Sequence, residues 1–397
     1  MTTLGVARSG SQTRAGLWSS VVLLAATGLI ALGVVMVFSA RGSTEPVELT
    51  WRFWKHRELR QLAFGLAAVG VMLAAASVPY RWLLPSRRLW QWWGFWLTVL
   101  AVGTLAAVLV PGIGAARHGS RRWLAIGPAG LGIGFQPSEL AKLAMVVWLA
   151  GIIGSGRLDL RSFWRGLLPA LIVPGLFVGL IGIEDFGTAV LLLVVAGLVL
   201  LACGARGWHM GLLVAPAAAA VTYLLVSKPY RLDRLKKWWN LWEHADDETY
   251  QQVQSLLAIF SGGLFGRGLG NSLAKFQHLP EARSDFIFAI ICEELGMLGG
   301  AGVVALYGAL VAATLATVRR CPDRFAQVAA LGCGLTLGLQ AVLNVAVVTA
   351  SVPPKGIALP LVSAGGTGLL ILAALVGLLA NMARRAETSP ADDTEEH

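Results

Sequence analysis

The chain concentrates ionisable side chains at four points on the edge of apolar runs, where a charged group is costly and therefore informative. The first point joins the pair Arg121 and Arg122 to the segment Gln136–Lys142. Pro137 suits the first turn of a helix, which places Lys142 on the next turn among apolar residues. This lysine either extends back to the surface or faces a polar cavity together with the two arginines. We expect the second arrangement, which would provide three cations for a phosphate.

The second point is the acidic segment Leu279–Gly296. If Pro280 opens a helix, Glu281, Asp285 and Glu293 fall on a four-residue repeat and share one face. Capping of a helix by Asp285, or pairing of Glu293 with a cation on another helix, would also explain these acids. A carboxylate beside lysine and arginine at a membrane edge can act as a general base, because burial and neighbouring charges tune its pKa.

The third and fourth points are shorter. Lys355, in the segment Val352–Gly356, is the sole cation between the last two apolar runs, and a plain turn with a surface lysine is the alternative to ligand binding. Glu184 and Asp185 interrupt a long apolar stretch, which indicates either a polar hinge or a catalytic role. Acids that can take a proton and cations that can stabilise a leaving phosphate together favour group transfer from a lipid-linked phosphate.

The composition assigns these segments to a membrane protein. Hydrophobic residues make up 56% of the 397 residues, charged residues make up 14%, and mean hydropathy is +0.68. These values exclude a disordered or nucleic-acid-binding chain, and the net charge of +10 is compatible with basic membrane loops. The six histidines and four cysteines form no metal-ligand spacing, and no Walker loop is present, so neither a His/Cys metal site nor use of ATP is expected.

We predict an all-α polytopic membrane protein with about ten transmembrane helices, because a bilayer core requires roughly 20 apolar residues per helix. The weakest division is the one at Glu184 and Asp185. The first apolar run exceeds the roughly 7 to 15 residues of a cleavable signal core, so it is expected to stay attached. The predicted helices lie near residues 17–39, 61–78, 90–110, 136–153, 166–183, 186–204, 207–226, 286–316, 327–350 and 359–382.

Residues 1–385 are predicted to form a single transmembrane domain, followed by a disordered acidic tail at 386–397. An even number of spans places both termini on one side, and the bias of arginine and lysine in short loops favours the cytoplasm. The long loop at about 227–285 between helices 7 and 8 then lies outside and is basic. Contact with lipid phosphates and water, or an anionic ligand handled on the outer side, would explain its charge.

Several motifs resemble the shape, elongation, division and sporulation (SEDS) family over nearly the whole chain. The long matching stretch from about Gln251 to Ala289 looks more similar to the division branch of the family, FtsW, than to the elongation branch, RodA. The matching pieces are Tyr250–Ser255, Gly262-Gly263, Gly266–Ser272, Leu279–Ala289, Glu293–Gly296, Arg122-Trp123, Gln136–Glu139 and Pro354–Gly356.

The resemblance implies a peptidoglycan glycosyltransferase that polymerises lipid II at the outer face of the cytoplasmic membrane. Asp285 matches the proposed catalytic residue, which would take the proton of the acceptor sugar hydroxyl. Inversion at the sugar requires no covalent nucleophile. The substrate-binding residues that we assign are Arg121, Arg122, Lys142 and Lys355 for the pyrophosphate of the undecaprenyl-linked glycan, together with Glu281 and Glu293.

The resemblance also implies partners, namely a class B penicillin-binding protein, other divisome proteins and membrane lipid, but no nucleic acid. A divalent cation, Mg²⁺ or Mn²⁺, would be an alternative source of positive charge at the pyrophosphate. The rival functions are a lipid II flippase, an elongation-type polymerase and a non-catalytic scaffold that recruits the transpeptidase. A flippase would require a polar path through the whole bilayer.

The chain departs from the family pattern in four places, one of which is the loop Trp242–Glu248, where the usual Asp-Pro is missing. Ile183–Thr188 stands where Gln-Pro-Asp-Leu-Gly-Thr is common, and Ala364 replaces a tyrosine. Arg283-Ser284 replaces His-Thr. These differences bear on the roles of Asp185 and of position 364, and they leave Asp285 unchanged.

Overall fold

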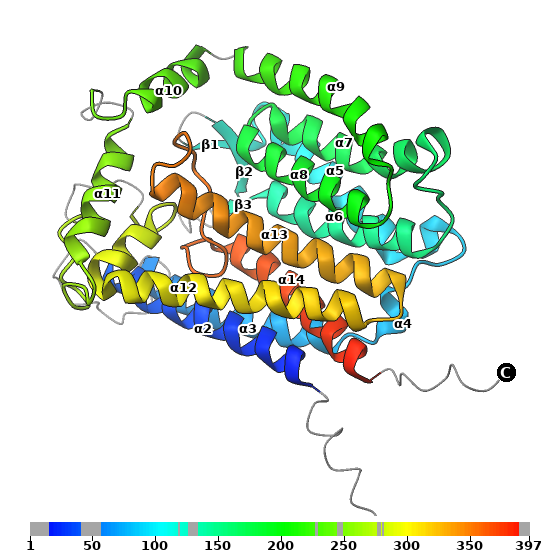
Figure 1. Ribbon diagram of the computed structural model, residues 1–397, viewed down its shortest axis with the longest axis horizontal. Helices are drawn as coiled ribbons and strands as arrows, with labels where there is room; N and C mark the ends of the chain where they lie inside the picture. The colour runs from blue at the N-terminus through cyan, green and yellow to red at the C-terminus, as the bar shows by residue number, and fades with distance from the viewer. Residues whose placement is uncertain are drawn as a thin grey trace, which may run out of the picture.

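The computed structural model is a bundle of helices capped at one end by a small sheet (Figure 1). Each of the ten predicted apolar segments contains a helix. The structure describes residues 16–40, 57–117, 120–125, 134–226, 229–243, 249–275, 279 and 282–388. The helices of these segments are α2 (Leu17–Ser39), α3 (Arg57–Ser77), α5 (Trp93–Leu109), α6 (Pro137–Gly154), α7 (Leu168–Gly182), α8 (Phe186–Ala202), α9 (Gly207–Val226), α12 (Ile287–Arg320), α13 (Arg324–Val348) and α14 (Thr367–Thr388).

Within the described residues, seven helices are long and apolar enough to cross a membrane. They are α2, α3, α6, α7 with the turn before it, α12, α13 and α14, and α5 and α8 are shorter apolar helices. A mostly helical chain with several candidate spans is therefore confirmed. The count of ten spans and the side of the membrane on which each loop lies stay predictions.

The helices pack through small residues, as expected where lipid supplies no hydrophobic drive between helices. A Cβ at Gly377 of α14 would lie 2.3 Å from the carbonyl oxygen of Met72 in α3. A Cβ at Gly154 of α6 would lie 2.7 Å from the Cα of Phe325 in α13. The backbones of these pairs therefore touch, and α13 is enclosed by α6, α12 and α14.

One predicted helix start is wrong. The last helix begins at Thr367 rather than near 359, and Leu361 has φ +65° within the intervening loop. Helix α12 begins at Ile287, close to the predicted residue 286, and residues 282–286 form turns, so Pro280 does not open this helix. Asp285 and Glu293 therefore do not share one helical face.

The segment predicted as a long loop contains two helices, α10 (Pro229–Trp239) and α11 (Tyr250–Gly262). In Figure 1 both lie toward one end of the bundle. The remaining short helices are α4 (Tyr80–Leu83), η2 (Leu89–Gln91) and the π-helix η3 (Phe163–Leu167).

Helix α12 is broken at Gly296, which has φ 73° and ψ −173°. This conformation is almost confined to glycine. The break frees backbone groups on both sides, and the loop after α11 satisfies them. Arg267 N–H donates to the Glu293 carbonyl at 3.0 Å, and Met297 N–H donates to the Gly263 carbonyl at 2.9 Å. Backbone hydrogen bonds therefore hold the loop after α11 against α12.

A three-stranded antiparallel sheet covers the ends of α5 and α6. Its strands, in spatial order, are β1 (Gly114–Arg117), β2 (Ser120–Ala125) and β3 (Gly134–Phe135). Leu124 pairs with Phe135, which fixes β2 against the chain just before α6. The sheet lies at the same end of the bundle as the loop between α13 and α14 (Figure 1).

Candidate active site

Three of the predicted charged residues meet in one ionic cluster at the sheet-covered end of the bundle. Asp185 caps the N-terminus of α8 by accepting from Thr188 N–H at 3.2 Å. Its carboxylate lies 3.0 Å from Lys355 Nζ and 3.4 Å from Arg122 Nη1. Arg122 also donates from Nε to the Glu184 carbonyl at 3.1 Å. We refer to Arg122, Asp185 and Lys355 as the ionic cluster.

The backbone around the ionic cluster is shaped to admit the lysine. A Cβ at Gly187 would lie 2.3 Å from Lys355 Cε. Glycine therefore leaves room for the lysine stem to cross the first turn of α8 and reach Asp185. A polar hinge was one predicted explanation of Glu184 and Asp185. These two residues lie in the turn between the end of α7 and the start of α8.

The ionic cluster has a net positive charge, because one buried carboxylate serves two cations. Asp185 lies in the turn between α7 and α8 and is only 4% exposed. Burial alone would raise its pKa, but the Lys355 ammonium and the Arg122 guanidinium outweigh burial and lower the pKa to about 2. Asp185 is therefore ionised at neutral pH and fixes the two cations in place.

Asp285 is half-buried in the turn before α12, beside the residue that follows Lys355. Its Oδ2 approaches Gly356 so closely that a Cβ there would be 2.8 Å away. Its carbonyl accepts from Asn344 Nδ2 at 2.7 Å, and Asn344 Nδ2 also donates to the Ile357 carbonyl at 2.7 Å. The turn that holds Asp285 and the loop that holds Lys355 are thus fastened to the same side chain of α13.

The turn is further fixed by the segment that replaces the predicted start of α14. The Ser363 hydroxyl donates to the Ser284 carbonyl at 2.5 Å, and Ala364 N–H donates to the Arg283 carbonyl at 3.0 Å. Position 364 contributes its backbone to this contact. The replacement of a tyrosine by Ala364 therefore leaves the support of the Asp285 turn intact.

Lys142 lies inside the bundle and is 2% exposed. Its Nζ lies 2.7 Å from Glu139 Oε1 and 2.6 Å from Gln340 Oε1. Gln340 Nε2 donates in turn to the Ala358 carbonyl at 2.9 Å. The lysine does not extend back to the surface. It binds the side chains of α6 and α13 and, through Gln340, supports the loop that carries Lys355.

A narrow cavity adjoins the ionic cluster between the ends of α5, α6 and α7. Arg122, Ser138, Glu184 and Asp185 line its polar part. Its remaining lining is largely apolar, with Leu105 from α5 and Ile181 from α7. The cavity holds only about 20 Å³, roughly the space of one water molecule, and its lining carries one cation and two carboxylates.

Glu293 lies in a different place, within the first part of α12, and is 1% exposed. Its carboxylate accepts from the Ser272 hydroxyl at 2.5 Å and from the N–H groups of Leu273 at 2.9 Å and Ala274 at 3.3 Å. Glu294 beside it accepts from the Ser39 hydroxyl and from Ser272 N–H. The acids of α12 hold the loop after α11, and the structure does not bring Glu293 to the ionic cluster.

Two predicted site residues are not placed in full. Arg121 belongs to β2 and pairs with Ala116 of β1, but its side chain lies outside the described part of the structure. Glu281 lies outside the described residues altogether. Their assigned roles stay predictions.

Sequence reasoning overlooked Gln340 and Asn344, which connect the site from within α13. Both are buried in the apolar run 327–350. Their four-residue spacing places them on one helical face, and polar residues inside an apolar span are informative. That spacing was the available signal.

The described residues contain no group of three or more His, Cys, Asp or Glu side chains that could hold a metal ion. At the ionic cluster the carboxylate of Asp185 is already paired with two cations. These side chains do not fit a metal centre supplied by the protein, and we derive no step through a metal.

The sequence profile of the FtsW/RodA/SpoVE family, described as cell cycle proteins, matches residues 19–388. The chain belongs to this family. Stage V sporulation protein E of Bacillus subtilis (strain 168) is 35% identical over 357 residues, which cover 90% of this chain and 94% of that protein. A probable peptidoglycan glycosyltransferase FtsW of Geobacter sp. (strain M18) is 34% identical over 374 residues, covering 93% and 97%.

Solved structures of FtsW/RodA/SpoVE proteins have the same fold. RodA of Thermus thermophilus aligns with TM-score 0.63 at 27% identity, covering 91% of this chain and 95% of that one. A chain from a study of polymerization and crosslinking by a peptidoglycan synthase complex aligns with TM-score 0.71 at 26% identity, covering 93% and 98%. Family membership and the apolar helices together make this a multi-pass membrane protein.

Proposed function

We propose that this FtsW/RodA/SpoVE protein is a peptidoglycan glycosyltransferase that polymerises lipid II at the outer face of the cytoplasmic membrane. The relatives named FtsW support this activity and favour the division branch. The observation that carries the proposal is the position of the Asp285 carboxylate against Gly356, next to the lysine of a net positive ionic cluster. This arrangement supports the assignment of a proton acceptor beside a site for an anionic leaving group.

In the proposed reaction, Asp285 takes the proton of the acceptor sugar hydroxyl of lipid II. The hydroxyl oxygen forms a bond to the anomeric carbon of the growing glycan, and the bond from that carbon to the pyrophosphate oxygen breaks. The pyrophosphate leaves on its undecaprenyl carrier with the electron pair. A single base and an activated leaving group give inversion at the anomeric carbon without a covalent intermediate.

Lys355 and Arg122 are proposed to stabilise the negative charge that develops on the pyrophosphate. Asp185 holds both cations before substrate arrives, so little reorganisation is needed in the transition state. Lys142, whose charge is matched by Glu139, is better suited to positioning the loop of Lys355 than to binding the pyrophosphate.

A membrane orientation and a partner complete the proposal. Both termini would be cytoplasmic, which places Asp285 and the ionic cluster at the outer side. The likeness to a chain from a peptidoglycan synthase complex supports assembly with a crosslinking enzyme, for which we propose a class B penicillin-binding protein. The other divisome proteins predicted above would join through that complex.

The test uses purified chain with its transpeptidase partner and labelled lipid II. Native protein should yield glycan polymer, and Asp285→Asn should lower the rate by about a hundredfold or more, because general base catalysis contributes roughly 10²–10⁴. Asp233→Asn, which alters a surface ion pair with Lys237 on α10, is the matched control and should retain the native rate.

If Asp285→Asn and native protein form polymer at the same rate, Asp285 is not the general base. If neither forms polymer while both move lipid II across vesicles, the flippase function replaces the enzyme. The predicted cation, Mg²⁺ or Mn²⁺, is checked in the same assay by adding a chelator, which lowers the rate if the cation takes part.

A further inference from the structure

A second hollow, of about 620 Å³, is lined by residues other than those of the ionic cluster. It opens between the segment Asp159–Trp164 and the start of α9. Helix α8 runs from the Asp185 cap toward this end, and its 17 residues span roughly 25 Å at 1.5 Å per residue. The hollow is therefore at the opposite end of the bundle from the proposed catalytic residue.

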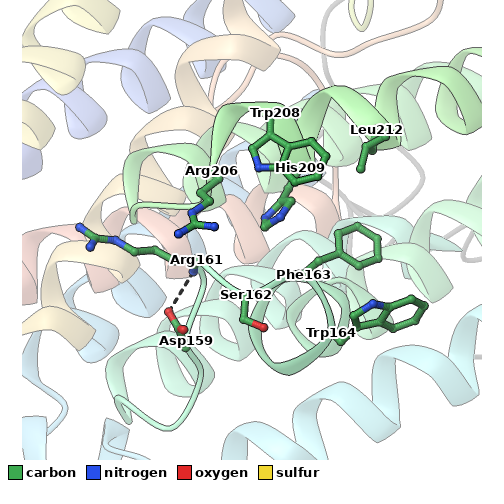
Figure 2. Close-up of a pocket in the computed structure, with 9 residues that line it drawn as sticks. All are labelled: Asp159, Arg161, Ser162, Phe163, Trp164, Arg206, Trp208, His209 and Leu212. Atoms are coloured by element: carbon green, nitrogen blue, oxygen red, sulfur yellow. Dashed lines mark hydrogen bonds between the residues drawn. The ribbon is translucent and has the colours of Figure 1, made fainter.

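His209 points into the hollow from α9 with an unused polar atom (Figure 2). The side chain is 6% exposed and lies between the rings of Phe163, 5.7 Å away, and Trp208, 4.5 Å away. Its Nδ1 is buried and has no hydrogen-bond partner in the described structure. A buried polar atom without a partner costs free energy, so this nitrogen indicates a ligand that supplies one.

The charged groups around His209 favour an anionic ligand. Arg161 and Arg206 line the hollow from its two sides. In Figure 2 the Arg206 guanidinium points from α9 toward the 159–162 loop. The single carboxylate in the lining, Asp159, accepts from the N–H of Arg161 at 3.0 Å. In Figure 2 the Arg161 side chain extends away from His209, so Arg206 is the cation that faces the imidazole.

The floor of the hollow is preformed. The chain enters α7 through the π-helix Phe163–Leu167, an irregular turn often found at functional sites. A Cβ at Gly166 would lie 1.8 Å from the Asp159 carbonyl oxygen. Glycine is therefore required where the π-helix touches the 159–160 backbone, and this contact fixes the loop that carries Arg161.

The rim of the hollow is apolar and aromatic. Trp164 is 73% exposed, Trp208 is 63% exposed and Leu212 is 54% exposed. Exposed tryptophans of a membrane protein gather at the level of the lipid head groups, where their rings meet both water and hydrocarbon. A ligand that joins a phosphate to acyl chains would use the Arg206 guanidinium and this rim at once.

We propose that the hollow binds the phosphate of an anionic phospholipid head group, with Arg206 and His209 as its ligands and Trp164 and Trp208 beside its acyl chains. Arginine pairs with phosphate oxygens through several N–H groups, and the imidazole supplies a further hydrogen bond. This lipid site is separate from the proposed active site and does not depend on the reaction that Asp285 carries out.

The test measures the melting temperature of the detergent-purified full chain during titration with short-chain phosphatidylglycerol, short-chain phosphatidylcholine or inorganic phosphate. We expect phosphatidylglycerol to raise the melting temperature at lower concentration than phosphatidylcholine. Arg206→Ala should weaken the apparent affinity for phosphatidylglycerol about fivefold, because each cation near an anionic lipid contributes a modest attraction.

His209→Phe keeps the ring between Phe163 and Trp208, removes Nδ1 and should also weaken binding. Arg157→Ala, at the same end but outside the lining, is the matched control and should bind as native protein does. If phosphatidylglycerol raises the melting temperature of native protein and of Arg206→Ala equally, the proposed site is wrong. If inorganic phosphate raises the melting temperature as much as phosphatidylglycerol does, and Arg206→Ala abolishes this rise, the site binds free phosphate and not a lipid.

Discussion

Asp285 and Glu293 lie only eight positions apart, yet the structure gives these carboxylates different surroundings. Glu293 is fully buried and its oxygens accept from one hydroxyl and two backbone N–H groups of the loop after α11. Asp285 is half-buried, sits in a turn, and faces Gly356 next to the ionic cluster. We therefore assign the fully buried Glu293 to holding structure and propose that the half-buried Asp285, beside fixed cations, takes a proton.

Glycines serve the two regions in different ways. In the Glu293 region, Gly296 breaks α12 so that backbone groups bond to the preceding loop. In the Asp285 region, Gly356 makes room for a carboxylate and Gly187 makes room for Lys355. The first type should matter for folding and the second for activity.

The largest effect is expected at the helix break. Gly296→Ala would place a Cβ 2.3 Å from the Leu264 carbonyl oxygen at a residue whose φ is 73°. We expect a loss of roughly 4 kcal/mol or more in the free energy of unfolding, enough to prevent recovery of folded protein. Gly302→Ala in the same helix meets open space and should fold normally. Folded yield by size-exclusion chromatography checks both.

A smaller effect, confined to activity, is expected at Gly356. The Cβ of Gly356→Ala would lie 2.8 Å from Asp285 Oδ2 and displace the carboxylate. We expect the polymerisation rate to fall about tenfold to a hundredfold with little change in melting temperature. Gly365→Ala, where the nearest atoms are 3.6 Å and 3.7 Å away, is the matched control. If Gly356→Ala polymerises at the native rate, this glycine does not position Asp285 for the reaction.

The ionic cluster should show itself in the pH dependence of stability. The Asp185 pKa is lowered from 3.8 to about 2, so its stabilising contribution is present above pH 4 and is lost as the pH falls toward 2. Its size is about 2 kcal/mol. Melting temperatures of native protein and Asp185→Asn should therefore differ at neutral pH and converge near pH 2. A constant difference across this range would contradict the ion pairing.

The smallest effect is expected from the cap of α8. Thr188 donates its hydroxyl to Asp185 Oδ2 at 2.9 Å. Thr188→Val keeps the shape and removes that donor, so we expect a loss of about 1 kcal/mol in unfolding free energy and a modest fall in rate. Thr104→Val, on the exposed side of α5, should change neither. Denaturation of both variants in parallel measures the difference.

Apolar run length and proline position predicted the helical part of the fold. Each of the ten segments contains a helix, Pro137 marked the first residue of α6, and the two acids at 184 and 185 marked the boundary between α7 and α8, but α10 and α11 were not predicted. These features are local, because each depends on a run of residues or on one residue's backbone preference.

Features set by contacts between distant segments escaped prediction. The turn at 282–286 before α12 is fixed by the Ser363 hydroxyl and the Ala364 N–H, which donate to the Ser284 and Arg283 carbonyls from a distant segment. The break at Gly296 is stable only because the loop after α11 supplies partners for both helix ends. The charges of the ionic cluster were predicted on separate segments. Their contact through Asp185 could be seen only in the folded structure. Nothing in the sequence singled out His209, because its interest comes from Nδ1, which has no hydrogen-bond partner in the described structure.

One side-by-side measurement tests the central difference between the two carboxylates. Asp285→Asn and Glu293→Gln are each prepared with native protein, and the polymerisation rate on lipid II and the melting temperature are measured for all three. We expect Asp285→Asn to lose about a hundredfold in rate with an unchanged melting temperature. We expect Glu293→Gln to melt several degrees lower, roughly 4 °C or more, while its folded fraction still polymerises. A native rate in Asp285→Asn, or a lost rate in a Glu293→Gln protein of unchanged melting temperature, would contradict this difference.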